Sequence, residues 1–248
     1  MSENIILAFL TFIVALIYSS VGHGGASGYL AVLSFFQVPH GQMATSALCL
    51  NLLVAGMAFW NFFKASHFSW RLTWPFCLTS IPFAFIGGFL KVPSAVYSFL
   101  LAAVLMFAAG RLLLEFGRKA KETSRLPSYF TSFLLGGSIG ILSGVVGVGG
   151  GIFLSPILLF FRWADPKRTA ATSAFFILVN SFAGLLGRSV QGHFQITEVL
   201  IYMVTAAFIG GIVGSRLGAN HFSGKWLKRI LACVLLIAAS KLLHALFA

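Results

Sequence analysis

Charged side chains are scarce in this chain. Only 9% of its 248 residues are charged, and only five are acidic, whereas a soluble domain carries about 25% charged residues. Cysteine is scarce too: Cys49, Cys77 and Cys233 lie in apolar stretches, and no two of them form a CxxC pair. The first shortage excludes an ordinary soluble domain, and the second argues against a disulfide framework or a cysteine-based metal site. We expect no bound metal and no cofactor.

Long apolar runs take the place of charge. Hydrophobic residues make up 58% of the chain, and apolar stretches recur, for example at 44–63, 72–90, 94–110, 197–215 and 230–247. Each stretch has about 17–22 residues, enough to cross a ~30 Å hydrocarbon core as a helix. The runs are continuously apolar rather than alternating, which favours helices over barrel strands. The sequence therefore predicts an all-α integral membrane protein that resides in a lipid bilayer.

The net charge of +12 raises the question of a nucleic-acid partner. The basic residues lie in short loops between the apolar runs, as the positive-inside rule requires of a membrane protein. No basic stripe with interleaved aromatic residues marks a soluble face. We expect no nucleic-acid partner.

The two halves of the sequence resemble each other. The stretch VGHGGASGYLAVLSFF at 21–36 matches VGVGGGIFLSPILLFF at 146–161. The segments ATSA (44–47 and 171–174) and FIGG (85–88 and 208–211) then match in the same order. These matches predict a single transmembrane domain made by duplication, with repeat one at 1–115, a polar linker at 116–128 and repeat two at 129–248.

Loop charge predicts how the repeats cross the membrane. Each repeat opens with a glycine-broken segment, 5–37 or 130–161. If both segments cross once, the 17 basic residues divide nine to eight between the two sides; if both turn back as hairpins, they divide fourteen to three. The positive-inside rule favours the second division. We therefore expect an inverted internal repeat, each half a glycine-broken helical hairpin plus three transmembrane helices, with about 8–10 helical segments.

The glycine clusters at 22–25 and 147–151 place bare backbone inside apolar segments. Glycine permits positive φ angles and close approach of a ligand. The second hairpin arms, 26–37 and 151–161, are about 16–18 Å long, roughly half a membrane, so they should begin near the midplane. A helix N-terminus offers unpaired N–H donors and a partial positive charge. Two such ends facing one cavity predict an anion site.

Other glycines are interpreted as packing positions. The series Gly136, Gly140 and Gly144, and the series Gly210, Gly214 and Gly218, have the four-residue spacing that lets two membrane helices approach closely.

The predicted substrate-binding residues are Gly22, His23, Gly24, Gly25, Ser27, Thr45, Ser46, Asn51, Gly147, Gly149, Gly150, Gly151, Thr172, Ser173 and Asn180. His23 is the one ionisable group expected near the midplane, where it would donate to an anion or take up a proton. The alternative is a neutral histidine bonded to a backbone carbonyl.

Several of these positions have a second interpretation. The Thr-Ser pairs at 45–46 and 172–173 are expected to begin the spans after the hairpins, where N-capping is the alternative. Buried Asn51 and Asn180 need partners and are candidates for a cavity wall. Arg111, Lys241 and Arg188 lie near span ends, where basic side chains snorkel to the interface, and Arg188 is also considered as an entry charge.

These segments resemble a known family. The run GVVGVGGGIFLSPILLFF with AATSA about ten residues later, the degenerate first copy, and FIGGIVGSRLGA are similar to the TauE/SafE sulfite-exporter family of membrane anion permeases. The resemblance covers nearly the whole chain and implies transport of sulfite, sulfonates, sulfoacetate or related anions. One departure is that His23 and Ala26 stand where the second copy has Val148 and Gly151, so the two half-sites are chemically unequal.

The sequence therefore predicts a transporter of a small anionic substrate, most simply sulfite or an organosulfonate such as a taurine-related compound or sulfoacetate, working by alternating access. An anion channel on the same scaffold is the main alternative, and a structural subunit is a further one. An enzyme is not expected, because the chain lacks HExxH and any nucleophile–base set at one depth. We expect a multi-pass protein of the bacterial inner membrane, with linker 116–128 cytoplasmic and both termini on the other side; whether it forms a homo-oligomer stays open.

Overall fold

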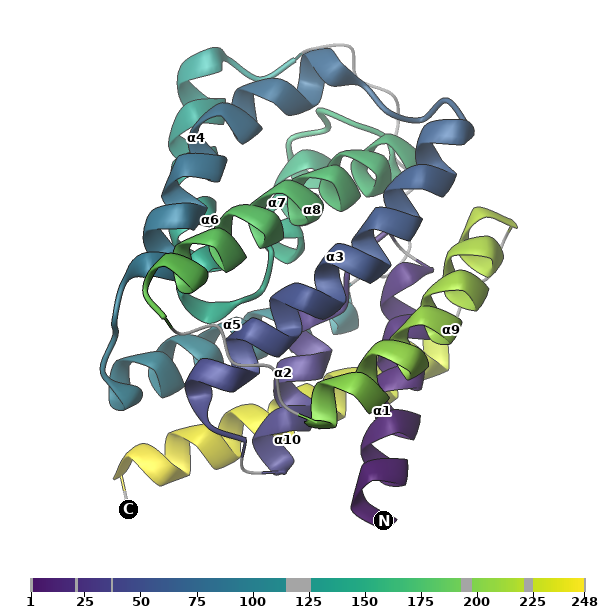
Figure 1. The fold of residues 1–248 in the computed structure, drawn as a ribbon. Coiled ribbons are helices and arrows are strands. Elements are labelled where there is room, and N and C mark those ends of the chain that lie inside the picture. The colour runs from purple at the N-terminus through teal and green to yellow at the C-terminus, as the bar shows by residue number, and fades with distance from the viewer. Residues whose placement is uncertain are drawn as a thin grey trace.

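The chain folds into helices throughout the part that the structure describes. The computed structural model describes residues 2–20, 22–36, 38–114, 126–192, 198–220 and 225–247, so most of linker 116–128 lies outside it. Ten helices follow one another there (Figure 1): α1 (Ser2–Ser19), α2 (Ala26–Phe35), α3 (His40–Lys64), α4 (Trp70–Phe89), α5 (Ser94–Leu114), α6 (Tyr129–Val146), α7 (Gly151–Phe160), α8 (Pro166–Val190), α9 (Glu198–Asn220) and α10 (Lys225–Phe247).

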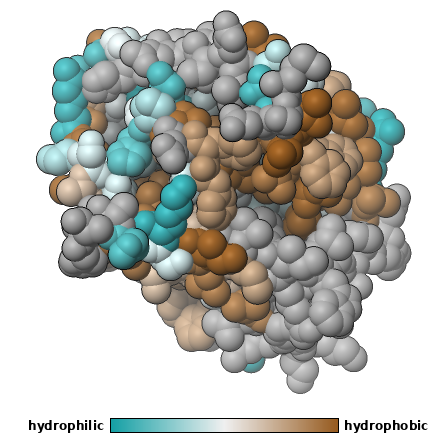
Figure 2. Space-filling model, turned by 90° about the horizontal axis from the view of Figure 1, so that it is seen from below, coloured by the Kyte–Doolittle hydropathy of each residue, from teal (hydrophilic) through white to brown (hydrophobic). Residues whose placement is uncertain are grey.

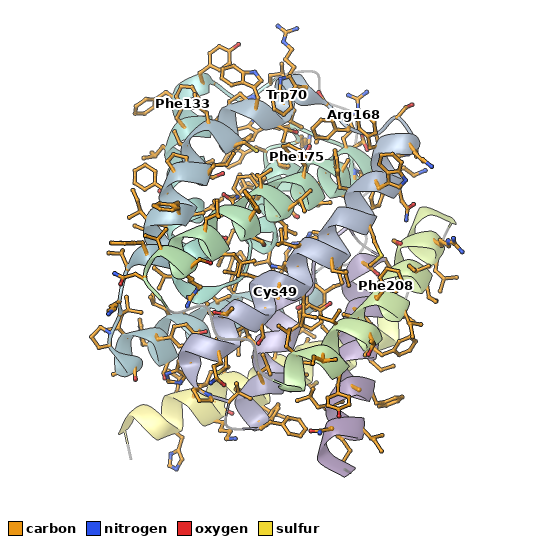
Figure 3. All side chains as sticks on the ribbon, viewed as in Figure 1. Cys49, Trp70, Phe133, Arg168, Phe175 and Phe208 are labelled. Carbon is orange, nitrogen blue, oxygen red and sulfur yellow. The ribbon has the colours of Figure 1, made fainter. Side chains whose placement is uncertain are left out.

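Six of these helices contain a segment long and apolar enough to cross a membrane: His40–Lys64, Trp70–Phe89, Ser94–Arg111, Tyr129–Val146, Pro166–Val190 and Leu200–Leu217. Their outward faces are also apolar. On α9, for example, Ile201 is 62% exposed, and Phe208 points away from the other helices (Figure 3). Seen from the end at which α3 begins, hydrophobic residues dominate the middle of the surface (Figure 2). The prediction of an all-helical, multi-pass membrane protein is confirmed.

Both predicted breaks are present. The first segment divides into α1, with 18 residues, and α2, with 10; the second divides into α6, with 18, and α7, with 10. The short arms are therefore about 15 Å long and the long arms about 27 Å. Because the arms are unequal, their length alone does not set the depth of the breaks.

The most extensive helix contacts join the first half of the chain to the second, and the contacts follow the same pattern in both halves. The two most extensive pairs are α4 with α6 and α1 with α9, in which the broken long arm of each half lies along the second span of the other half (Figure 1). The pairs α3 with α8 and α5 with α10 join equivalent helices of the two halves. Residues from both halves of the chain therefore pack into one common core.

The two central helices, α3 and α8, run antiparallel. Phe62 near the end of α3 packs with Ala170 and Ala171 near the start of α8. At the other end, a Cβ built on Gly184 of α8 would lie 3.3 Å from Leu48 Cδ1 of α3. The helices that follow the two glycine-broken segments therefore point in opposite directions along this pair.

The spaced glycines hold helices together at backbone distance. A Cβ on Gly136, Gly140 or Gly144 of α6 would overlap the carbonyl oxygen of Phe76, Ser80 or Ala84 of α4. On α9, a Cβ on Gly214 would overlap the Leu16 carbonyl of α1. The interpretation of these series as packing positions is confirmed for every member except Gly218, whose surroundings lie outside the described part of the chain.

Candidate functional site

Two glycine loops interrupt the broken helices. The first tip loop (residues 22–25) has positive φ at Gly22 and Gly25, and the second tip loop (residues 147–150) has positive φ at Gly147, Gly149 and Gly150. Only glycine adopts such angles without strain, and this accounts for the clusters. The matched pairs Gly22 with Gly147 and Gly25 with Gly150 both have positive φ. The third pair differs, because Gly149 has a φ of +76° and Gly24 does not have a positive φ.

Each tip loop starts a helix whose first N–H groups are uncapped. Gly25 (φ +95°) precedes α2, Gly150 (φ +82°) precedes α7, and neither helix has a side-chain cap. The first-turn residues Ala26, Ser27, Gly151 and Ile152 are buried or nearly so. Buried, uncapped N–H groups at a helix start are donors for an anion.

The tip loops meet around Asn51 of α3 and Ile177 of α8. A Cβ on Gly24 would overlap Asn51 Oδ1 and lie 3.1 Å from Ile177 Cγ2; a Cβ on the matched Gly149 would lie 2.7 Å from Asn51 Nδ2 and 2.8 Å from Ile177 Cγ2. Asn51 Nδ2 also donates to the Val148 carbonyl at 3.2 Å and to Ser181 Oγ at 3.3 Å. One asparagine therefore fills the space that a side chain at either glycine would need.

This meeting point lies half-way along the two central helices. Asn51 is near the middle of α3 and Ile177 is near the middle of α8, and both helices have 25 residues. The outer sides of the loops also pack across the halves: a Cβ on Gly22 would lie 2.6 Å from Ala170 Cβ, and one on Gly147 would lie 2.7 Å from Ala44 Cα. If α3 and α8 cross the bilayer, the tip loops lie near its midplane.

His23 of the first tip loop reaches into the second half. Its Nε2 lies 2.9 Å from Ser155 Oγ of α7, which donates to the Gly151 carbonyl at 2.7 Å and lies 2.8 Å from Ser173 Oγ. Ser155 Oγ therefore lies within hydrogen-bond distance of His23, of the Gly151 carbonyl and of Ser173. His23 is 7% exposed, so this link between the halves is shielded from water.

The remaining predicted residues are buried but have different surroundings. Ser27 Oγ is 2.6 Å from the Tyr18 hydroxyl, and the Thr73 hydroxyl donates to Thr172 Oγ1 at 3.2 Å. The Thr45 hydroxyl donates to the Gly41 carbonyl of its own helix, and Ser46 is 1% exposed. Of the two Thr-Ser pairs, Ser173 contacts Ser155 of the His23 cluster.

The N-capping alternative for these pairs is wrong. The helices begin earlier than expected, at His40 and Pro166, and the cap positions are Pro39 and Asp165. Asp165 accepts hydrogen bonds from the backbone N–H groups of Lys167 and Arg168. The threonines and serines therefore lie one to two turns inside the helices.

The interfacial placement of Arg188 is also wrong. Arg188 is only 6% exposed, and its Nη2 donates to the carbonyls of Gly144 at 3.3 Å and Val145 at 2.8 Å. The Tyr97 hydroxyl donates to the next carbonyl, that of Val146, at 3.2 Å. These two side chains satisfy consecutive carbonyls where α6 ends, so His23 is not the only buried ionisable group beside the loops. Lys241, in contrast, is exposed and donates to the Ser34 carbonyl.

Sequence reasoning missed Ser155 and Ser181, and it placed Arg188 at the interface or as an entry charge instead of in the buried part of the protein. The search relied on positions that match between the repeats, and Ser155 of the second copy matches Leu30 of the first. Arg188 lies two residues before the end of α8, a position typical of an interfacial charge, and the local sequence carries no sign of its burial.

The tip loops are closed to solvent in this conformation, since the described residues of both are buried. A surface hollow of about 520 Å³ lies elsewhere, where α2 ends and α3 and α5 begin, and includes Ser34, His40 and Ser94 in its lining. Any ligand at the loops must therefore be reached by a change of conformation.

Comparison with known proteins identifies relatives along the whole chain. The model of the family "Sulfite exporter TauE/SafE" matches residues 7–242. A "Probable membrane transporter protein" of Sinorhizobium fredii is 34% identical over 98% of this chain and 99% of its own length. Proteins with the same description from Methanocaldococcus jannaschii and Bacillus subtilis are 27% and 26% identical over 93% and 83% of the chain, and 91% and 88% of their own lengths. No solved structure matches the chain. This protein is a multi-pass membrane transporter rather than an enzyme, and it belongs to the TauE/SafE family.

Proposed function

We propose that the protein is a secondary transporter of a small oxyanion, with sulfite or an organosulfonate as its substrate. The observation that carries the proposal is the pair of uncapped helix starts at Gly25 and Gly150, whose loops meet at one asparagine. The printed name of the matching family, sulfite exporter, supports the same substrate class.

The oxyanion would be held by neutral donors. The first N–H groups of α2 and α7 would supply partial positive charge, and the His23 ring, the Ser173 hydroxyl and the Asn51 amide could add hydrogen bonds from the same region. Removing the substrate from water costs free energy, and several hydrogen bonds to the charged oxygens offset that cost. The oxygens around the sulfur of sulfite or of a sulfonate point in different directions, so they can accept hydrogen bonds from several donors at once.

Alternating access would follow from an inverted repeat. The antiparallel course of α3 and α8 and the exchanged pairs α1 with α9 and α6 with α4 support two halves that face opposite sides of the membrane. Movement of one half against the other around Asn51 would open the loops first to one side and then to the other. An anion channel would need a continuous path, and the burial of both loops favours the transporter.

The test is uptake into proteoliposomes. We expect uptake of sulfite, thiosulfate, taurine or sulfoacetate that saturates with concentration, measured with and without a pH gradient. Uptake restricted to cationic or uncharged solutes would refute the proposal. Single-channel currents in planar bilayers would support the channel instead. An uptake rate that rises when the inside is made alkaline would assign the coupling to protons.

A further inference from the structure

We propose a second oxyanion-binding site, which we call the station. It would be formed by the buried side chains of Ser80, Ser143, Asn180 and Arg188, and Ser143 lies one turn of α6 before the second tip loop. The station rests on the proposed function, because it would hold the same substrate at a further point along its path. Ser80 is in α4, Ser143 is in α6, and Asn180 and Arg188 are in α8.

These four side chains share an unusual property. Ser80 Oγ, Ser143 Oγ, both polar atoms of Asn180 and Arg188 Nε are buried and have no hydrogen-bond partner among the described residues. Ser80, Ser143 and Asn180 are 0% exposed. A buried polar group without a partner costs about 1–3 kcal/mol, and such groups are rare in native proteins. Several of them in one helix interface are groups that a polar ligand could satisfy.

Helix packing brings the three neutral side chains together. A Cβ on Gly184 of α8 would lie 3.5 Å from Gly144 Cα of α6 and 3.8 Å from the Ala84 carbonyl of α4, so the three helices meet at this level. Ser80 and Asn180 lie four residues before Ala84 and Gly184, and Ser143 directly precedes Gly144. A Cβ on Gly140 of α6 would overlap the Ser80 carbonyl, and Ser143, three residues after Gly140, lies on nearly the same face of α6. Asn180 lies one turn before Gly184 on the same face of α8, so all three residues lie at the interface of α4, α6 and α8. We call these three residues the polar layer.

Arg188 gives the station its charge. Its Nη2 donates to the carbonyls of Gly144 and Val145, which directly follow Ser143 in α6. The one acidic side chain that the structure describes, Asp165, is paired with Arg168 at the opposite end of α8. The end of α6 offsets only about half a charge, and buried charges are normally paired.

The available donors select an anion over other ligands. Two serine hydroxyls, the Asn180 Nδ2–H and the Arg188 Nε–H can all donate to the same oxygens, whereas a cation would be repelled by Arg188. Water could accept these hydrogen bonds but would not balance the charge. An oxyanion does both.

The other half of the chain shows that the fold does not require this polarity. The matched repeat segments place Met203, Tyr18 and Leu53 at the positions of Ser80, Ser143 and Asn180. Met203 belongs to the apolar core, Leu53 packs against it, and the Tyr18 hydroxyl is 2.6 Å from Ser27 Oγ. At these three matched positions the residues are therefore apolar or, at Tyr18, have a hydrogen-bond partner, and the fold does not require the polar layer there.

The test is calorimetric titration of the purified protein with sulfite and, separately, with thiosulfate, together with uptake. We expect two binding equivalents per chain in the wild type and one in Asn180→Leu, which copies the matched residue. Ser143→Ala and Arg188→Gln should weaken the second equivalent by about 5- to 100-fold and slow uptake. The matched control is Ser138→Ala, since Ser138 of α6 is exposed and bonds to the Leu134 carbonyl of its own helix; it should leave both equivalents unchanged.

The outcomes separate this station from the proposed function. One equivalent in the wild type, or two equivalents retained in both Asn180→Leu and Ser143→Ala, would overturn the station while oxyanion transport stands. Failure of the wild type to bind or move any oxyanion would overturn the proposed function and the station with it. If Asn180→Leu does not fold, Ser143→Ala decides, because it removes a single atom from the polar layer.

Discussion

The Nδ2 atom of Asn51 lies 3.2 Å from the carbonyl oxygen of Val148, a residue 97 positions further along the chain. The Oδ1 atom of the same amide faces Gly24 in the first tip loop. A single side chain of α3 thus touches both loops. Any movement of one loop relative to the other must break or remake a contact of this amide.

Replacing Asn51 should therefore impair transport more than stability. We expect Asn51→Ala to slow oxyanion uptake at least about tenfold and to lower the free energy of unfolding by about 1–3 kcal/mol, because Val148 and Ser181 lose a donor. The matched control is Asn61→Ala on the same helix, which loses the hydrogen bond to Ser215 but lies away from the loops. Uptake and thermal unfolding are measured for both; equal uptake in the two variants would contradict a role for Asn51 at the loops.

Side chains at the matched glycines Gly24 and Gly149 should block the meeting of the loops. Gly149→Ala adds strain from its φ of +76° to the overlap with Asn51, and Gly24→Ala adds the overlap alone. We expect both to abolish uptake, with Gly149→Ala the less stable, by about 1–3 kcal/mol. Gly110→Ala is the control, because a Cβ there meets nothing within 4 Å; it should be neutral or slightly stabilising. Normal uptake by Gly24→Ala would contradict the prediction.

His23 and Ser155 should be energetically coupled. We expect His23→Ala and Ser155→Ala each to weaken substrate binding, and the double variant to weaken it by less than the sum, with a coupling of about 0.5–3 kcal/mol. The measurement is a double-mutant cycle on the dissociation constant of sulfite. Ser240→Ala, at an exposed serine bonded within its own helix, provides the baseline for an uncoupled site. Strict additivity of His23→Ala and Ser155→Ala would show that their contact does not contribute to binding.

The proposed inverted arrangement of the halves predicts from which side of the membrane two loops can be reached. In a background with Cys49, Cys77 and Cys233 replaced by alanine, His40→Cys and Asp165→Cys should react with a membrane-impermeant thiol reagent from opposite sides of the membrane. These positions start α3 and cap α8, the two antiparallel helices. Labelling of both cysteines from the same side would refute the inverted topology and the alternating-access proposal with it.

Much of the fold follows from local sequence properties. Apolar length identifies the spans, glycine clusters mark the breaks because only glycine takes positive φ freely, and four-residue glycine spacing marks close packing. The Thr-Ser pairs at 45–46 and 172–173 were expected to begin two spans, but the helices begin earlier, at His40 and Pro166, because the first turns are polar and are not part of an apolar run. Helix existence was thus easier to predict than helix boundaries.

The candidate site could be predicted where the two repeats agree and where a polar residue such as His23 or Asn51 stands out in an apolar segment. Gly24 and Gly149 were found because they match, and they do meet at one place. Ser155 and Arg188 depend on contacts between segments far apart in sequence, His23 with Ser155 and Arg188 with Gly144. A basic residue near a helix end has the same local sequence whether it faces the lipid headgroups or a neighbouring helix, so its burial is a tertiary property.

The pairing of α1 with α9 has a consequence for how the chain is made. The backbone of Leu16 packs against Gly214, which is synthesised about 200 residues later. At roughly 5–20 residues per second, the ribosome takes about 10–40 s to produce that partner. During this interval the first helix must be held by lipid, by the insertion machinery or by a chaperone, and a nascent chain stalled before α9 would expose an unfilled groove for quality control to detect.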